Sequence, residues 1–470
     1  MIIKIFRYIE RDVAMRSLKL AAVLLAVSML GFGCGGGTSG KSAPAPAGGS
    51  DAGKTVVQMW VMPNSLEPVR DIEAVLAEFE KENPGIKVKI TSVDWGSAWT
   101  KITTAATSGD TPDIVQLGST WVGAISAMGA LVDLSDKVSE IGGEAAFLPV
   151  AWVSSGLEGG KAVTSIPWFV DCRALYYRAD VLKKAGVPAG DLAEWTSFEN
   201  TLKKIKESDI EIDGIKVVPL GIPGKNDWNV IHNISPWIWG AGGDFLSKDR
   251  KTSVINSQAA VDGMMYYVGL VKKGLVPLDA LELNTAQVSS NFNNGSYSMY
   301  FDGPYEVKTL TMPAEQGGTA GSITSRNFAI APYPAGPKGR FAFVGGSNLA
   351  IFKSAKNKEA AWQVIKFLSG NKSQVNYAKS TGFLPSVKTA FEDPYFSSDP
   401  YRKVFKEAVN YGRTYPCVSS WGIIEPILVR RLGILWDHVL VTRDADLKKV
   451  IKSDLDAAAK EINQVLSSRK

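Results

Sequence analysis

From residue 55 onward, stretches that suit strands alternate with stretches that suit helices. Residues 55–61 (TVVQMWV) and 86–90 (IKVKI) are rich in β-branched and apolar residues and predict strands. Between them, apolar residues recur every three or four positions, at Val69, Ile72, Val75, Leu76 and Phe79. We expect a helix here that opens at a capping box over 64–67 and ends at Asn83-Pro84-Gly85. A strand–helix–strand unit of this kind predicts a parallel sheet and an α/β fold.

The same alternation continues to the end of the chain. It predicts strands at 113–116, 174–177, 216–220, 296–301, 328–331 and 347–352. It predicts helices at 99–107 and 121–128, after a capping box at 196–199, from Ser257 to Gly274, and after Asn357. No short repeat of fixed period is present, which excludes a solenoid. Because 470 residues exceed the usual single core, we expect two α/β lobes.

The N-terminal segment has the features of an export signal. Arg16 and Lys19 precede an apolar run over 20–32, too short to span a bilayer, so we interpret residues 1–33 as a signal peptide. Leu30-Gly31-Phe32-Gly33-Cys34 resembles a bacterial lipobox, which implies lipidation of Cys34. The leucine lies one place upstream of the usual position, and a plain signal peptide is the alternative. Residues 34–54 lack large apolar side chains and predict a flexible tether.

Composition and charge exclude several classes of protein. With 45% hydrophobic and 21% charged residues the chain is an ordinary globular protein. The net charge of +5 is partly carried by the first 33 residues, so no basic surface for nucleic acid or anionic lipid is expected. Apart from Cys34, the cysteines are Cys172 and Cys417, which permit either one long-range disulfide or two free thiols.

Cofactor and metal motifs are missing from the sequence. The two histidines, His232 and His438, are isolated from cysteines and from other donors at metal-ligand spacing. Gly240-Ala-Gly-Gly243 lacks the strand–helix frame and the Gly-Lys-Ser/Thr of a phosphate loop, and no Gly-x-Ser-x-Gly motif occurs. We therefore expect neither a metal nor a cofactor, and no enzymatic activity.

Tryptophan is abundant, with 13 in the chain, many of them at predicted strand ends and loops. Indole faces beside Asp, Asn and Arg suit a ligand with apolar C–H faces and a rim of hydroxyl groups, which describes a sugar. Ordinary core packing is the competing explanation, and it is favoured for Trp195 and Trp362 because of their helical context.

Several motifs, in their order along the chain, resemble the extracellular solute-binding proteins of bacterial ABC importers, in the sugar-binding family that includes the maltose-binding protein. They are FEKENPGI (79–86), SGDTPDIV (108–115) followed by GSTW (118–121) and GALVDL (129–134), IPWFVDCR (166–173) with LYYR (175–178), and FNNG (292–295) with Gly303-Pro304. The resemblance covers residues 55–470. Where the family often carries Trp, this chain has Tyr305.

The resemblance implies a two-lobed periplasmic-binding-protein type II fold, with three inter-lobe crossings and a central ligand cleft. It implies an N-terminal lobe of 55–169 and 300–350 and a C-terminal lobe of 170–299 and 351–470. It also implies delivery of a carbohydrate to membrane permease subunits by an exported monomer, either lipid-anchored or periplasmic. Loop position nominates these ligand-binding residues: Asn64, Trp95, Thr120, Trp121, Trp168, Asp171, Arg173, Asp227, Trp228, Trp237, Tyr305 and Trp421.

A secreted glycoside hydrolase is the alternative function, because such enzymes also line clefts with tryptophan and carboxylates. The sequence offers no convincing pair of motif-embedded glutamates for it. Arg173 has a structural alternative, pairing with Asp171, and Asp227 could instead cap a turn.

Overall fold

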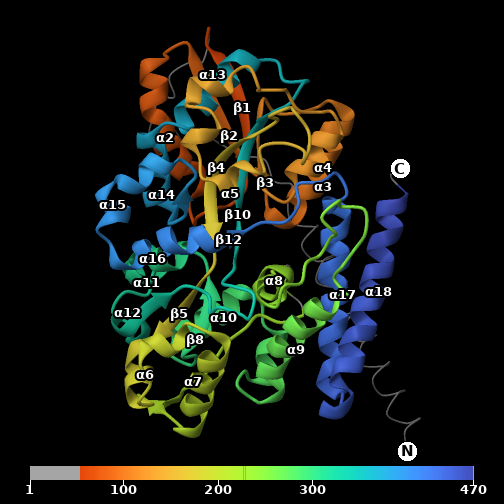
Figure 1. Cartoon of the computed structure of the whole chain (residues 1–470). Coiled ribbons are helices and arrows are strands. Elements are labelled where there is room, and N and C mark those ends of the chain that lie inside the picture. The colour runs from red at the N-terminus through yellow and green to blue at the C-terminus, as the bar shows by residue number, and fades with distance from the viewer. Residues whose placement is uncertain (1–52, 226, 228, 469–470) are drawn as a thin grey trace, which may run out of the picture. The chain divides into compact units, whose positions relative to one another are not determined.

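The computed structural model describes residues 53–225, 227 and 229–468. The predicted signal peptide, Cys34 and most of the predicted tether lie outside the described residues, as does Trp228. Figure 1 shows the whole chain, with most of the helices and strands of the described residues labelled.

The described strands form three sheets. A seven-stranded sheet has the order β11-β4-β10-β3-β1-β2, with β12 also paired to β10; a second has the order β8-β5-β9; β6 and β7 form a pair. The strands are β1 (Thr55–Val61), β2 (Ile86–Ser92), β3 (Ile114–Gly118), β4 (Ile166–Cys172), β5 (Ala174–Arg178), β6 (Glu211–Ile212), β7 (Ile215–Lys216), β8 (Met299–Asp302), β9 (Phe328–Ala331), β10 (Ala342–Ile351), β11 (Leu384–Pro385) and β12 (Gly412–Arg413).

Helices connect and cover these strands (Figure 1). They are α2 (Pro68–Glu82), α3 (Trp95–Ser108), α4 (Val122–Ala127), α5 (Pro149–Trp152), α6 (Ala179–Lys184), α7 (Trp195–Glu207), α8 (Val230–Gly240), α9 (Gln258–Lys272), α10 (Thr285–Asn293), α11 (Tyr305–Thr311), α12 (Ile323–Asn327), α13 (Lys358–Leu368), α14 (Asn371–Thr381), α15 (Pro394–Ser397), α16 (Pro400–Ala408), α17 (Trp421–Val441) and α18 (Leu447–Ser467). The long helices α17 and α18 run side by side (Figure 1).

The predicted parallel sheet is confirmed for the first three strands. β1 pairs parallel with both β2 and β3, because α2 and α3 are the crossovers between them. β10 joins the same sheet antiparallel to β3 and to β4. The register between β10 and β4 shifts between Ser347 and Asn348. Gly346, beside this irregularity, has a φ of 133°, and a Cβ there would lie 2.1 Å from the Phe169 carbonyl oxygen, so only glycine fits.

Most predicted elements are present, and two predicted capping boxes are wrong. Ser257 caps α9 as expected, accepting a hydrogen bond from the Ala260 amide. However, α2 follows Glu67 without a side-chain cap, and α7 already begins at Trp195. The Asn64 side chain instead bonds to distant parts of the chain, because tertiary partners compete for its amide. The strand predicted at 216–220 shortens to β7.

Two hydrophobic clusters form the core of the described residues. One gathers side chains from 57–169 and 349–387 together with Cys417. The other gathers Ala151 and side chains from 170–344 and 375–462. The second cluster thus includes side chains from residues 301–344 together with those of the segment before them. The boundaries of the lobes and the number of crossings between them stay predictions.

Both described cysteines, Cys172 and Cys417, are buried free thiols, so the second of the two predicted alternatives holds. Burial raises the pKa of the Cys417 thiol to about 12, which keeps it protonated at neutral pH. Among the described helices, none combines the length and the apolarity needed to cross a membrane.

Candidate functional site

The carboxyl ends of β3 and β4 lie on either side of the middle of β10 and bring several predicted ligand residues close together. In the register of the large sheet, Ser347 of β10 lies opposite Gly118 of β3, and Gly345 lies opposite Asp171 of β4. The Ser119 amide donates to the Gly346 carbonyl oxygen at 3.0 Å. The loop that carries Thr120 and Trp121 and the end of β4 therefore flank the same short piece of β10.

Three indoles form an aromatic cluster, Trp95, Trp99 and Trp121, beside the end of β3. The rings of Trp95 and Trp121 meet edge-on, with centroids 5.5 Å apart, and Trp99 lies 5.7 Å from Trp121. The Trp95 Nε1 donates to the Pro63 carbonyl oxygen at 3.1 Å, which fixes the ring against the loop after β1. All three side chains are half-buried, so part of their surface remains available to a ligand.

Asn64 belongs to a buried polar network next to the aromatic cluster. Its Nδ2 donates to Gln116 Oε1 at 3.1 Å and to the Tyr377 hydroxyl at 2.9 Å. The Gln116 Nε2 in turn donates to Ser347 Oγ at 2.8 Å. The network ties the loop after β1 to β3, β10 and α14, so Asn64 positions this loop. Gln116, a polar residue within an apolar strand, was missed by the sequence reasoning although that pattern could have indicated it.

Thr120 contacts a carboxyl group that the sequence reasoning also missed. Its hydroxyl donates a hydrogen bond to Glu425 in α17. Burial raises the pKa of Glu425 to about 7, and the hydrogen bond from Thr120 acts in the opposite direction. The available signal was a lone carboxylate inside the apolar run 421–428 (WGIIEPIL).

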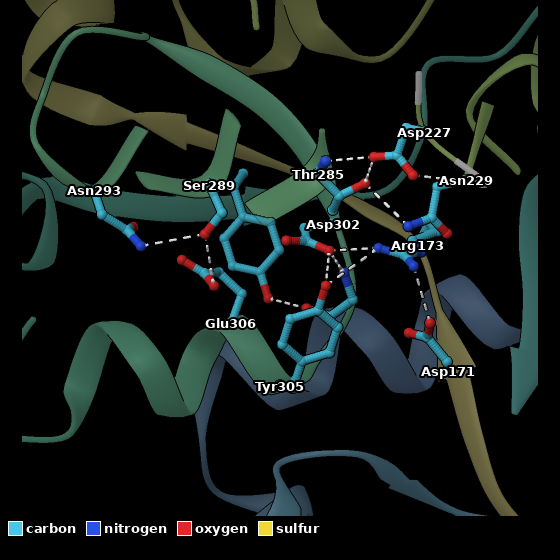
Figure 2. A network of polar contacts seen from close by, with 12 residues as sticks. Asp171, Arg173, Asp227, Asn229, Thr285, Ser289, Asn293, Asp302, Tyr305 and Glu306 are labelled. Carbon is cyan, nitrogen blue, oxygen red and sulfur yellow. Dashed lines mark hydrogen bonds and ion pairs between the residues drawn. The ribbon is translucent and has the colours of Figure 1, made fainter. Parts of the chain in front are cut away.

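A charged cluster, Asp171, Arg173, Asp302 and Tyr305, lies where β4, β5, β8 and α11 meet (Figure 2). The Arg173 Nη2 lies 3.2 Å from Asp171 Oδ2, and its Nη1 donates to Asp302 Oδ1. The Tyr305 hydroxyl and the Gly303 amide also donate to Asp302 Oδ1, the amide at 2.7 Å. Arg173 and Asp302 are buried, with exposed fractions of 4% and 0%. The cluster thus fixes the end of β4 to the turn between β8 and α11.

The charged cluster contains polar atoms that are buried without a hydrogen-bond partner. They are Asp171 Oδ1, Arg173 Nε and Asp302 Oδ2. A Cβ at Gly303 would lie 2.3 Å from Asp171 Oδ1, so glycine permits this close approach. Burial raises the pKa of Asp171, while the Arg173 guanidinium acts to lower it. Orphaned buried atoms at the end of a strand are groups that a bound molecule could satisfy.

Glu306 lies beside this cluster, next to Tyr305, and accepts a hydrogen bond from Ser289 Oγ at 3.2 Å (Figure 2). Burial, followed by the charge of Asp302, raises its pKa to about 8. A carboxyl group whose pKa is higher in the folded state holds its proton there while the unfolded chain releases it. Its contribution to stability is therefore complete below about pH 4.5 and is lost as the pH rises toward 8.

Glu306→Gln should remove this dependence. We expect the difference in unfolding free energy between the variant and the unmodified protein to change by at most about 1.4 kcal/mol per pH unit between pH 5 and 8, in favour of the variant at higher pH. Urea unfolding at a series of pH values measures it. Parallel curves for the two proteins would show that Glu306 does not carry the proton.

Asp227 is engaged in local bonds. Its Oδ1 accepts from the Asn229 amide at 2.7 Å, and its Oδ2 accepts from the Thr285 amide and, at 2.5 Å, from the Thr285 hydroxyl (Figure 2). These bonds hold the loop before α8 against the start of α10, which corresponds to the turn-capping alternative. The neighbouring Trp228 lies outside the described residues.

Three of the nominated tryptophans lie inside the hydrophobic clusters. Trp168 is 2% exposed and stacks on Tyr377 with centroids 4.3 Å apart. Trp237 and Trp421 are 1% and 0% exposed, and Trp421 stacks on Tyr415 at 4.8 Å. The structure does not bring these three rings to the ends of β3 and β4 with an open face. An alternating apolar pattern cannot separate an indole that faces a ligand from one that fills a core.

The described residues contain no group of three or more His, Cys, Asp or Glu side chains that could hold a metal ion. The groups at the site are instead indoles, hydroxyl groups, carboxylates and one guanidinium. These side chains can cover the apolar face of a ligand and form hydrogen bonds with the polar groups at its rim.

Comparison with known proteins gives consistent matches. The model of the family described as bacterial extracellular solute-binding protein matches residues 64–375, more than half of the chain. The diacetylchitobiose binding protein DasA of Streptomyces coelicolor is 27% identical over 414 residues, which cover 86% of this chain and 90% of that protein. A maltooligosaccharide ABC transporter solute-binding lipoprotein of Streptococcus pneumoniae is 24% identical over 431 residues, 90% of each protein.

Among solved structures, the sugar-binding protein MalE of Xanthomonas citri superposes with a TM-score of 0.73 at 24% identity. The match covers 88% of this chain and 98% of MalE. The likeness establishes that the chain has the fold of MalE, as the sequence resemblance implied.

Proposed function

Because the chain belongs to the family of bacterial extracellular solute-binding proteins, we propose that it is the substrate-binding protein of an ABC importer and that its ligand is a sugar or oligosaccharide. The observation that carries this proposal is the position of β10 in the large sheet. β10 pairs with β3, which ends beside the aromatic cluster, and with β4, which ends at the charged cluster. The relatives named for diacetylchitobiose and maltooligosaccharides support the same ligand class.

The aromatic cluster and the charged cluster contact different parts of the sugar. Trp121 and Trp95 cover the C–H face of a sugar ring, and burial of about 100 Å² of such a face contributes roughly 2.5 kcal/mol. Asp171 and Arg173 exchange hydrogen bonds with hydroxyl groups, and bonds to charged groups are the stronger kind. Thr120 and Tyr305 add hydroxyl partners. Micromolar affinity, near −8 kcal/mol, requires both contributions.

The proposed ligand site is narrower than the set nominated from the sequence. It retains Trp95, Thr120, Trp121, Asp171, Arg173 and Tyr305, with Asn64 positioning the loop beside them. Trp168, Trp237 and Trp421 serve the cores, and Asp227 fastens a loop. Trp228 lies outside the described residues and stays a prediction.

Release of an unaltered ligand is part of the proposal, and the family, whose members are binding proteins, supports it. In the proposed cycle, ligand stabilises a closed arrangement only as far as it binds that arrangement more tightly. The ligand then passes to permease subunits in the membrane. Export directed by residues 1–33 and lipid attachment at Cys34 would hold the protein near that permease through the tether of 34–54.

A thermal-shift screen of neutral mono- and oligosaccharides tests the proposal. A binding protein should show reversible stabilisation that grows with ligand concentration, and chromatography should recover the sugar intact. Stabilisation accompanied by shortened products would favour the glycoside hydrolase alternative. The absence of any stabilising sugar would contradict the proposed ligand class.

A further inference from the structure

The charged cluster carries more negative than positive charge. Asp171 and Asp302 both pair with a single guanidinium, that of Arg173. Within the described part of the chain, Arg173 is the only cationic side chain that bonds to a member of the charged cluster or of the aromatic cluster. With both carboxylates ionised, the cluster has a formal charge of −1, and no second cation is present there to receive an anionic ligand.

The orphaned atoms in this cluster specify what a ligand group must offer. Asp171 Oδ1 and Asp302 Oδ2 are acceptors without a donor, and Arg173 Nε is a donor without an acceptor. A hydroxyl group donates one hydrogen bond and accepts others, so it suits both kinds of atom. A carboxylate or a phosphate accepts only. It would leave the two acceptors unpaired and bring a like charge next to them.

Glu425 places another carboxyl group on the side of the aromatic cluster. The side chain of Glu425 is half-buried, and Thr120 supplies its hydrogen bond. No cationic side chain of the described residues forms an ion pair with it. A carboxyl group thus lies on each side of the middle of β10, Asp171 on the side of β4 and Glu425 on the side of β3.

We propose that this site accepts neutral sugars and excludes sugars that carry a carboxylate or a phosphate. The inference rests on the proposed sugar-binding function and narrows it to a substrate class defined by charge. Asp171 is the residue that sets the selectivity, because it combines an unpaired acceptor with the ion pair that occupies Arg173.

Matched sugars test the selectivity on the unmodified protein. Calorimetry would compare maltose, cellobiose and diacetylchitobiose with derivatives in which one hydroxymethyl group is oxidised to a carboxylate. For each sugar that binds, we expect the neutral form to bind at least tenfold more tightly than its own carboxylate derivative, the uronate. Equal or tighter binding of the uronate would overturn this inference and leave sugar binding intact. If no sugar in the panel binds, the proposed function fails and the inference fails with it.

Asp171→Asn provides the second arm, since it removes one negative charge and frees Arg173 Nη2. We expect the preference for the neutral sugar over its uronate to fall at least tenfold. Glu359→Gln removes the same charge from a side chain that is 71% exposed and pairs with Lys137, and should leave the preference unchanged. An unchanged preference in Asp171→Asn, or an equal fall in both variants, would contradict the role of Asp171. If Asp171→Asn does not fold, the comparison on the unmodified protein still decides the matter.

Discussion

Replacing Asp302 with alanine should lower the free energy of unfolding by about 2–4 kcal/mol, because the buried Arg173 guanidinium loses an acceptor and keeps Asp171 as its one carboxylate partner. The Tyr305 hydroxyl and the Gly303 amide would lose their acceptor in the same change. Chemical unfolding measures the loss, and an unchanged slope against denaturant would show that the folded state is otherwise preserved.

Asp302→Asn is the matched control for this variant. It keeps one acceptor oxygen, removes the charge and replaces the other oxygen by an NH2 group, so we expect a smaller loss than for alanine. A loss of less than about 1 kcal/mol in Asp302→Ala would mean that the charged cluster does not stabilise the fold in the way its geometry suggests.

Replacing Trp121 with alanine should weaken sugar binding at least tenfold while changing the thermal midpoint little. The half-buried indole gives up a face worth roughly 2.5 kcal/mol of binding, and 1.4 kcal/mol corresponds to a factor of ten. Calorimetry with the best sugar from the screen measures the affinity.

Trp195→Ala is the control for the indole loss. This ring stacks on Tyr266 at 4.2 Å, in packing that belongs to the other hydrophobic cluster. The control should lower the midpoint without changing the affinity of the folded protein. If Trp121→Ala keeps full affinity, the aromatic cluster is not part of the ligand site.

The sequence predicted the fold well because periodicity reports on local structure. The alternation at 328–331 and the cap at Ser257 predicted β9 and α9 correctly, since local propensity and burial agree there. The capping boxes failed because a side chain such as Asn64 has distant partners that the sequence does not reveal. The place of β10 between β3 and β4 is likewise a long-range property.

The candidate site could be predicted only in part, for a related reason. Loop position found Trp121 and Asp171, which the register of β10 brings to the same place. It could not distinguish them from Trp237, which the chain buries among other aromatic side chains. Glu425 and Asp302 were missed because their partners, Thr120 and Arg173, are far away in the sequence.

A crystal structure of the protein with a neutral oligosaccharide from the screen is the most direct test. We predict one intact sugar that lies against the Trp121 ring and donates a hydroxyl hydrogen bond to Asp171 Oδ1. A sugar found cleaved, or bound at a place remote from both residues, would contradict the account.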